Sequence, residues 1–160
     1  MMDKSIINQC SVVLTRKCNL RCSFCYAKDA GYCESEMVSF ENLKKIIDFC
    51  CEAKVRYVFF TGGEPLLYPY LDDILVYIKE KRHPITTAVA TNGILFEDLL
   101  FCKKMIDSGL DYIDVSIKGN NTQKWVKNTG YNGYIKQQKA IKNLSLLGIC
   151  LLYTSPSPRD

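Results

Sequence analysis

The feature that most constrains the fold of this chain is a regular alternation of short apolar runs with segments of helical periodicity. Four apolar runs have the length of β-strands, at residues 11–15, 55–60, 85–91 and 111–117. The segments between them carry apolar residues three and four positions apart, and a last helix is expected over 134–147. Ser39 is a suitable N-cap for the first helix, and Gly109 a suitable stop for the third. This rhythm predicts parallel βαβ units with right-handed crossovers, and so an α/β fold.

The two faces of the expected strands differ in chemistry. In the fourth strand one face carries Ile113, Val115 and Ile117, and the other carries Tyr112, Asp114 and Ser116. In the third strand Ala88, Ala90 and Asn92 share a face. If the apolar rows pack against the helices, the small and polar rows line a cavity at the centre of a barrel. We therefore predict a partial (β/α) TIM-like barrel that stops after about four βα units.

The end of the sequence interrupts this pattern. A fifth strand should begin after Ile149, but the chain continues as CLLYTSPSPRD, a run with no periodicity. This run matches the in-frame translation of a transposon-end adapter used in sequencing libraries, an interpretation that we favour over a natural disordered tail. We therefore divide the chain into an incomplete core domain, residues 1–149, and a non-native segment, residues 150–160, and expect disorder after Cys150.

Composition narrows the classes of function. The 160 residues are 48% hydrophobic, enough for a core, and the net charge of +4 is spread along the chain rather than gathered in blocks. Neither a signal peptide nor an apolar run of membrane-spanning length is present, which favours a cytoplasmic protein without a membrane partner. The lysine-rich segment Lys124–Lys142 contains Trp125, Tyr131 and Tyr134. We interpret it as a solvated amphipathic helix in preference to a tRNA contact, and nucleic acid is not an expected partner.

Nine cysteines in a chain without a secretion signal indicate metal binding or burial rather than disulfides. Cys50, Cys51 and Cys102 fall inside helical patterns, and we interpret them, with the isolated Cys10 and Cys33, as small buried hydrophobes.

Three of the remaining four cysteines form the pattern CNLRCSFC directly after the first strand, at Cys18, Cys22 and Cys25. A loop of this spacing can place three thiolates on three irons of a single cluster and leave the fourth iron open to a ligand. Closely spaced cysteines also suit structural zinc, but zinc needs a fourth ligand. The single histidine, His83, lies in an expected turn and is interpreted as solvated.

Four motifs in this order resemble the radical S-adenosylmethionine (SAM) superfamily. They are the CxxxCxxC loop with aromatic Phe24, Gly62-Gly63-Glu64-Pro65 after the second strand, Thr91-Asn92-Gly93 after the third, and Ser116-Ile117-Lys118-Gly119 after the fourth. The resemblance covers residues 11 to about 149. It implies a [4Fe-4S] cluster on the three cysteines, with SAM beside it.

The resemblance also suggests roles for the other motif residues, and the residue types agree with them. Gly62 and Gly63 would let the backbone approach a ligand, and Glu64 would accept from the amino group of SAM. Asn92 and Ser116 would bind the methionyl carboxylate or the ribose, although a capped strand end is the rival interpretation of each. Phe24 would lie against adenine or pack within its own loop.

The activity implied by the resemblance is radical chemistry. A flavodoxin or ferredoxin supplies an electron, SAM is cleaved to a 5′-deoxyadenosyl radical, and the radical abstracts hydrogen from a small-molecule or peptide substrate. The motif layout is similar to a broad group of molybdenum-cofactor, haem-biosynthesis-like and peptide-modifying enzymes, many of which have an acidic residue where this sequence has Lys118. Lys118 points either to the site or to the surface. The alternative function is a non-catalytic iron–sulfur or zinc module.

Overall fold

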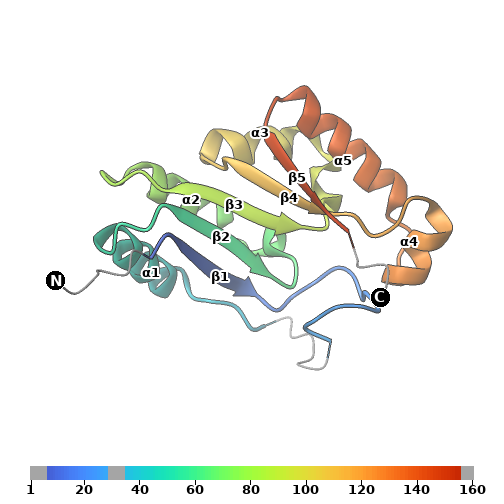
Figure 1. Cartoon of the computed structure of the whole chain (residues 1–160), viewed down its shortest axis with the longest axis horizontal. Coiled ribbons are helices and arrows are strands. Elements are labelled where there is room, and N and C mark those ends of the chain that lie inside the picture. Colours follow the sequence, from blue (N-terminus) through green and yellow to red (C-terminus); the bar gives the residue numbers. More distant parts are fainter. Residues whose placement is uncertain (1–6, 29–34, 156–160) are drawn as a thin grey trace.

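The computed structural model describes residues 7–28 and 35–155, which fold around one parallel sheet (Figure 1). The strands lie side by side in the order in which they occur in the chain. They are β1 (Gln9–Thr15), β2 (Tyr57–Gly62), β3 (Thr86–Thr91), β4 (Tyr112–Ser116) and β5 (Cys150–Thr154). All four neighbouring pairs are parallel, as the strand–helix rhythm predicts.

Helices connect the strands. They are α1 (Phe40–Glu52), α2 (Leu71–Lys79), α3 (Leu99–Ser108), α4 (Thr122–Thr129) and α5 (Tyr134–Leu146), with the short 3₁₀ helices η1 (Pro65–Leu67) and η2 (Ile94–Glu97) after β2 and β3. Ser39 accepts from the backbone N–H of Asn42 and caps α1, and Gly109 ends α3 with a φ of 114°. Both predicted helix boundaries are confirmed.

The apolar rows of the strands face α1, α2, α3 and α5, and together they form the core. Val58, Phe60, Val89, Ile113 and Val115 are fully buried there. The opposite face of the sheet is open, and Val13, for example, is 55% exposed. The predicted α/β fold with the architecture of a partial barrel is therefore confirmed, because each strand contributes one row to the core and one to the concave side.

The number of strands and the end of the chain differ from the sequence-based expectation. Residues Cys150–Thr154 form β5, paired with β4 over its full length from Tyr112 to Ser116, so disorder after Cys150 is wrong for this segment. The open edge of β4 offers unpaired backbone donors and acceptors, and leucine, tyrosine and threonine suit a pleated strand. Leu151 also packs against the core. The adapter origin of residues 150–160 stays a prediction, and residues 156–160 lie outside the described residues.

Two further expectations are corrected. Residues 124–142 are not one solvated helix but belong to α4 and α5, and the side chain of Trp125 is fully buried. His83 is partly buried, and its Nε2 lies 2.8 Å from the carbonyl oxygen of Val55, so it is not simply solvated. Cys50 and Cys102 are buried as expected, Cys10 and Cys51 partly so, and Cys33 lies outside the described residues.

Across residues 7–28 and 35–155, no helix combines the length and apolar character needed to cross a membrane.

Candidate functional site

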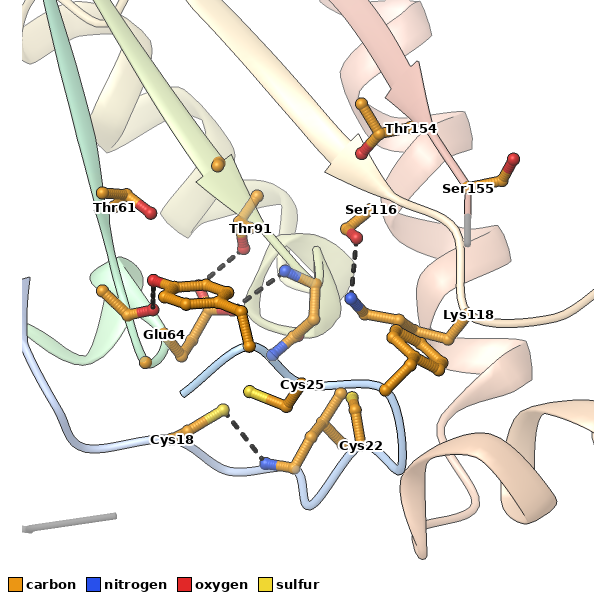
Figure 2. A pocket seen from close by; sticks show the side chains of 17 residues that line it. Cys18, Cys22, Cys25, Thr61, Glu64, Thr91, Ser116, Lys118, Thr154 and Ser155 are labelled. Atoms are coloured by element: carbon orange, nitrogen blue, oxygen red, sulfur yellow. Dashed lines mark hydrogen bonds between the residues drawn. The ribbon is translucent and has the colours of Figure 1, made fainter. Parts of the chain in front are cut away.

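A cavity of about 310 Å³ opens at the C-terminal ends of the strands (Figure 2). Parallel sheets in α/β proteins characteristically bind ligands at this edge. All nine predicted site residues line the cavity: Cys18, Cys22, Phe24, Cys25, Gly62, Gly63, Glu64, Asn92 and Ser116. The structure therefore brings together the ends of β2, β3 and β4 and the cysteine loop, although their roles in binding stay predictions.

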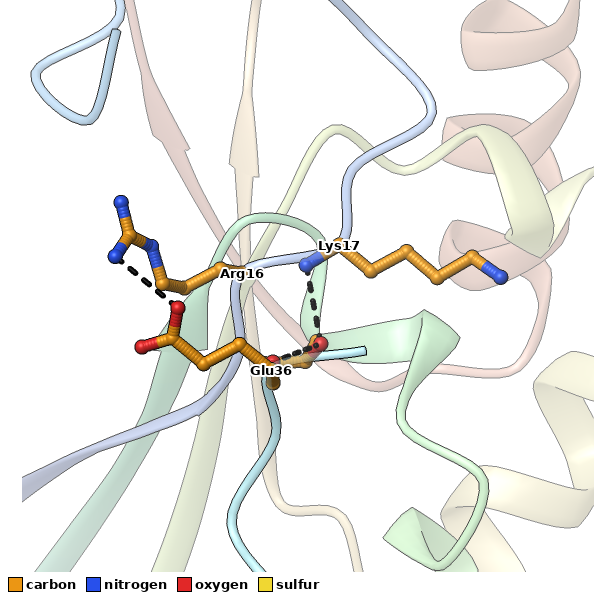
Figure 3. A network of polar contacts seen from close by, with 4 residues as sticks. Arg16, Lys17 and Glu36 are labelled. Carbon is orange, nitrogen blue, oxygen red and sulfur yellow. Dashed lines mark hydrogen bonds and ion pairs between the residues drawn. The ribbon is translucent and has the colours of Figure 1, made fainter. Parts of the chain in front are cut away.

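The cysteine loop leaves β1 through a set of polar contacts (Figure 3). The backbone N–H of Arg16 donates to the carbonyl of Glu36 at 2.9 Å, and the Arg16 guanidinium pairs with the Glu36 carboxylate at 3.2 Å. The Thr15 hydroxyl donates to the same carbonyl and accepts from the backbone N–H of Lys17. These contacts fix the direction in which the chain enters the loop.

Helix α4 holds the far side of the loop. The backbone N–H groups of Arg21 and Ser23 donate to the carbonyls of Thr129 and Asn128, at 3.1 and 2.8 Å. Leu20 packs with Trp125 in a second small apolar cluster. The contact between Leu20 and Trp125 thus holds the cysteine loop against α4. This packing explains why Trp125 is buried rather than exposed.

The three thiols lie on one side of the cavity, below the strand ends (Figure 2). Burial raises the pKa of Cys18 to about 11 and raises the pKa of Cys22, which the nearby Lys118 cation partly offsets. In the described part of the chain, no three His, Cys, Asp or Glu side chains form a group suited to a single metal ion. A cluster distributes its thiolates over different irons and does not require that convergence.

Gly62 and Gly63 bring β2 against the start of the cysteine loop. A Cβ at Gly62 would lie 2.3 Å from the carbonyl oxygen of Thr15, and one at Gly63 would lie 2.3 Å from that of Lys17. The N–H groups of Gly63 and Glu64 donate to these same two oxygens, at 2.7 and 2.8 Å. The glycines are therefore required for contact between two chain segments, a reason that differs from the expected approach to a ligand.

Glu64 is buried, with 1% of its surface exposed, and its carboxylate is fixed by three donors. Oε1 accepts from the Thr91 hydroxyl at 2.6 Å and from the N–H of Leu66 at 3.2 Å, and Oε2 accepts from the N–H of Asn92 at 2.9 Å. Burial raises the pKa of Glu64, and the three hydrogen bonds oppose that rise. The carboxylate thus joins the ends of β2 and β3 while it borders the cavity.

Asn92 uses all of its polar groups within the protein. Its backbone N–H binds Glu64, its side-chain Oδ1 accepts from the N–H of Ile94 at 3.0 Å, and its Nδ2 donates to Oδ1 of Asn19 at 2.8 Å. Its carbonyl accepts from Gln137 Nε2, also at 2.8 Å. These contacts show the capped strand end that was the rival interpretation, and they tie β3 to the cysteine loop.

Lys118 points into the cavity rather than to the surface. Its Nζ donates to the Ser116 hydroxyl at 2.6 Å and lies 5.3 Å from the centre of the Phe24 ring. No carboxylate of the described residues pairs with it. Phe24 therefore packs against the Lys118 cation and against the small apolar cluster that contains Leu20 and Trp125. The Lys118 side chain gives the rim of the cavity a positive charge.

Sequence reasoning did not identify Asn19, Thr91 or Gln137 as parts of the site. Asn19 lies inside the cysteine motif and Thr91 inside the third motif, so position alone was a usable signal for both. Gln137 stands between Lys136 and Gln138 in a polar stretch, and nothing in its sequence surroundings indicates that it is fully buried.

Comparison with known proteins agrees with this geometry. The model of the radical SAM superfamily matches residues 12–154. A "Probable GTP 3′,8-cyclase" of Methanococcus maripaludis is 31% identical over 136 residues, which are 85% of this chain and 45% of that protein. An Fe-coproporphyrin III synthase of Methanosarcina barkeri is 37% identical over 108 residues, 66% of this chain and 26% of that one. The chain thus spans less than half the length of these relatives.

Solved structures show the same fold. The Streptococcus suis protein SuiB, bound to its precursor peptide SuiA, superposes with a TM-score of 0.80 at 20% identity, over 94% of this chain and 33% of that one. The protein anSMEcpe with bound AdoMet gives 0.75 at 17% identity, over 91% and 42%. Because the family model matches most of the sequence, the chain belongs to the radical SAM superfamily, whose members use a [4Fe-4S] cluster and SAM as cofactors.

Proposed function

We propose that the cavity at the strand ends holds a [4Fe-4S] cluster on Cys18, Cys22 and Cys25, with SAM beside it. We propose further that the complete protein is an enzyme acting on a small-molecule or peptide substrate. The observation that carries this proposal is the convergence of three thiols from one loop with the ends of β2, β3 and β4 around one cavity. When bound, the cluster and SAM supply the reductive cleavage that yields a 5′-deoxyadenosyl radical for hydrogen abstraction.

The donor set fits a cluster with one open iron. Three cysteines supply three thiolates, and among the described residues no three His, Cys, Asp or Glu side chains converge on a single ion. The N–H of Leu20 lies 3.4 Å from the sulfur of Cys18, where it stabilises a thiolate. These features favour the cluster over structural zinc, which needs four converging ligands.

The residues around the thiols have separate tasks in this proposal. Lys118 places a cation at the rim of the cavity, where it would attract the carboxylate of SAM or an anionic part of the substrate. Glu64 and Asn92 act mainly as fixed supports, since their oxygen and nitrogen atoms already have partners. The Ser116 hydroxyl accepts from Lys118, and its second lone pair, which no donor among the described residues uses, would accept from a ligand.

The identity of the substrate is a separate question. Relatives with 31% and 37% identity are named for GTP and Fe-coproporphyrin III, and a structure with the same fold binds a precursor peptide. The concave face of the sheet is open, with Val13 and Leu152 both more than half exposed. We propose that the substrate lies over this face, and that a flavodoxin- or ferredoxin-type protein supplies the electron.

Electron paramagnetic resonance (EPR) after anaerobic reconstitution with iron and sulfide tests this proposal. The dithionite-reduced wild-type protein should show a [4Fe-4S] signal whose shape changes when SAM is added. Cys22→Ala should abolish the signal, whereas the matched variant Cys51→Ala should keep it, because Cys51 lies on α1 outside the cavity. A signal that is indifferent to SAM would instead support a non-catalytic electron-transfer module.

A further inference from the structure

Gln137, in the first turn of α5, makes contacts that are unusual for a helix residue with polar neighbours in the sequence. Its side chain is fully buried, and its Nε2 donates to two carbonyl oxygens, those of Asn92 at 2.8 Å and Ser116 at 3.0 Å. Asn92 directly follows β3, and Ser116 is the last residue of β4. One amide therefore joins the ends of two strands at the edge where the cavity opens.

The strand ladder does not make this connection by itself. The last registered pair between β3 and β4 is Thr91 with Val115, one residue before Asn92 and Ser116. Beyond that pair, the distance between the two carbonyls depends on the two donors of the Gln137 amide. Gln137 Oε1 has no hydrogen-bond partner in the described part of the chain, so the side chain is held there by its donors alone.

Both anchored residues carry side chains that reach the cavity. Asn92 Nδ2 binds Asn19 of the cysteine loop, and the Ser116 hydroxyl accepts from Lys118. A change in the spacing between the two carbonyls would therefore move the support of the cysteine loop relative to the cation at the rim.

We propose that Gln137 is a positioning residue for SAM: its amide sets the spacing between the ends of β3 and β4, and thereby the affinity of the cavity for SAM. This inference rests on the proposed function of the cavity. Gln137 itself does not line the cavity, so it acts through Asn92 and Ser116 rather than by contact with the ligand.

The same helix provides a matched control. Asn143 is also buried, and its Nδ2 donates to two carbonyls, those of Phe96 and Glu97, both at 3.0 Å. Those carbonyls belong to η2, and neither residue lines the cavity. Loss of either amide removes two hydrogen bonds to backbone carbonyls, so the two losses should cost similar stability, although the Phe96 carbonyl keeps a bond from Cys102 Sγ at 3.1 Å. Only the loss at Gln137 should change the site.

The experiment compares wild type, Gln137→Met and Asn143→Leu after anaerobic reconstitution of each protein. Iron content, thermal unfolding and the EPR change of the reduced cluster are measured during titration with SAM. We expect both variants to keep their iron and to unfold at lower temperature. Gln137→Met should need about tenfold more SAM for half of the EPR change, which corresponds to about 1.4 kcal/mol, and Asn143→Leu should match wild type. If Gln137→Met does not fold, Gln137→Asn, a smaller change, takes its place in the titration. It should also need more SAM than wild type for half of the EPR change.

The outcomes separate the two claims. A wild-type signal that does not respond to SAM refutes the proposed function, and the inference with it. If wild type responds and the Gln137 variant titrates at the same SAM concentration, only the positioning role is wrong. Equal weakening by the Gln137 and Asn143 variants would show a general loss of stability, and this too overturns the positioning role.

Discussion

Replacement of Gly63 by alanine tests how the glycine pair supports the cysteine loop. The added Cβ would lie 2.3 Å from the carbonyl oxygen of Lys17, 2.7 Å from its carbonyl carbon and 2.8 Å from the carbonyl oxygen of Arg16. All three atoms belong to the backbone, so no side-chain rotation relieves the contact. The start of the loop must move by about 1 Å to restore ordinary van der Waals separation.

The energetic cost follows from two contributions. Overpacking of a well-filled region costs about 1–3 kcal/mol. The displacement also weakens the bonds from the N–H groups of Gly63 and Glu64 to the carbonyls of Thr15 and Lys17, each worth about 1 kcal/mol. If one of the two bonds survives, Gly63→Ala destabilises the fold by about 2–4 kcal/mol. For a chain of this length that lowers the melting temperature by roughly 5–15 °C.

Thermal unfolding followed by circular dichroism measures the loss of stability, and iron content after reconstitution measures the effect on the loop. Gly148→Ala is the matched control. Gly148 lies just before β5, its φ is 69°, and no atom of the described residues lies within 4 Å of its hypothetical Cβ. Backbone strain of about 1 kcal/mol is expected there, with unchanged iron content.

A Gly63→Ala protein with the melting temperature and iron content of wild type would refute the claim that this glycine is required by the chain leading to Cys18. Equal losses in the two variants would show that the close approach at Gly63 costs no more than the backbone strain at Gly148.

Lys118→Met removes the cation that lowers the pKa of Cys22, so alkylation of Cys22 in the metal-free protein, followed by peptide mass spectrometry, should shift to higher pH; an unchanged profile contradicts the assigned contact. Burial raises the pKa of Glu64 above its ordinary value of 4.5, so its contribution to stability is complete below about pH 4.5 and is lost as pH rises through the raised pKa. The difference in unfolding free energy between wild type and Glu64→Gln, measured by urea titration, should therefore fall as pH rises. A difference that stays flat or rises with pH would contradict the raised pKa of Glu64. Removal of residues 150–160 leaves β4 without a neighbour on one edge, and size-exclusion chromatography should show oligomers or aggregates. A monomeric protein of residues 1–149 that unfolds cooperatively would show that this edge needs no cover.

Much of the fold and the candidate site could be predicted because the relevant signals are local. Alternating residues in a strand point to opposite faces, so Ile113 and Val115 could be assigned to the core from the sequence. The motif residues follow strands directly, and the carboxyl ends of parallel strands meet at one edge of a sheet. These two facts are enough to bring the three cysteines and Glu64 to one cavity.

The missed features depend on contacts between distant segments. Cys150–Thr154 shows no periodicity, and it becomes a strand only because the edge of β4 is available for pairing. Gln137 looks like any polar helix residue, and its burial follows from how α5 packs across the ends of β3 and β4.

By itself, the sequence determined the α/β class, the order of the motifs and the residue types at the site, because periodicity and spacing depend only on residues that are close together in the sequence. Only the tertiary structure decided which atoms those residues bind. It directed Glu64 and Asn92 toward internal partners, turned Lys118 into the cavity and placed Gly63 against Lys17. The physical reason is that a buried polar group must find its partner in space, and for these residues the partner lies on another segment of the chain.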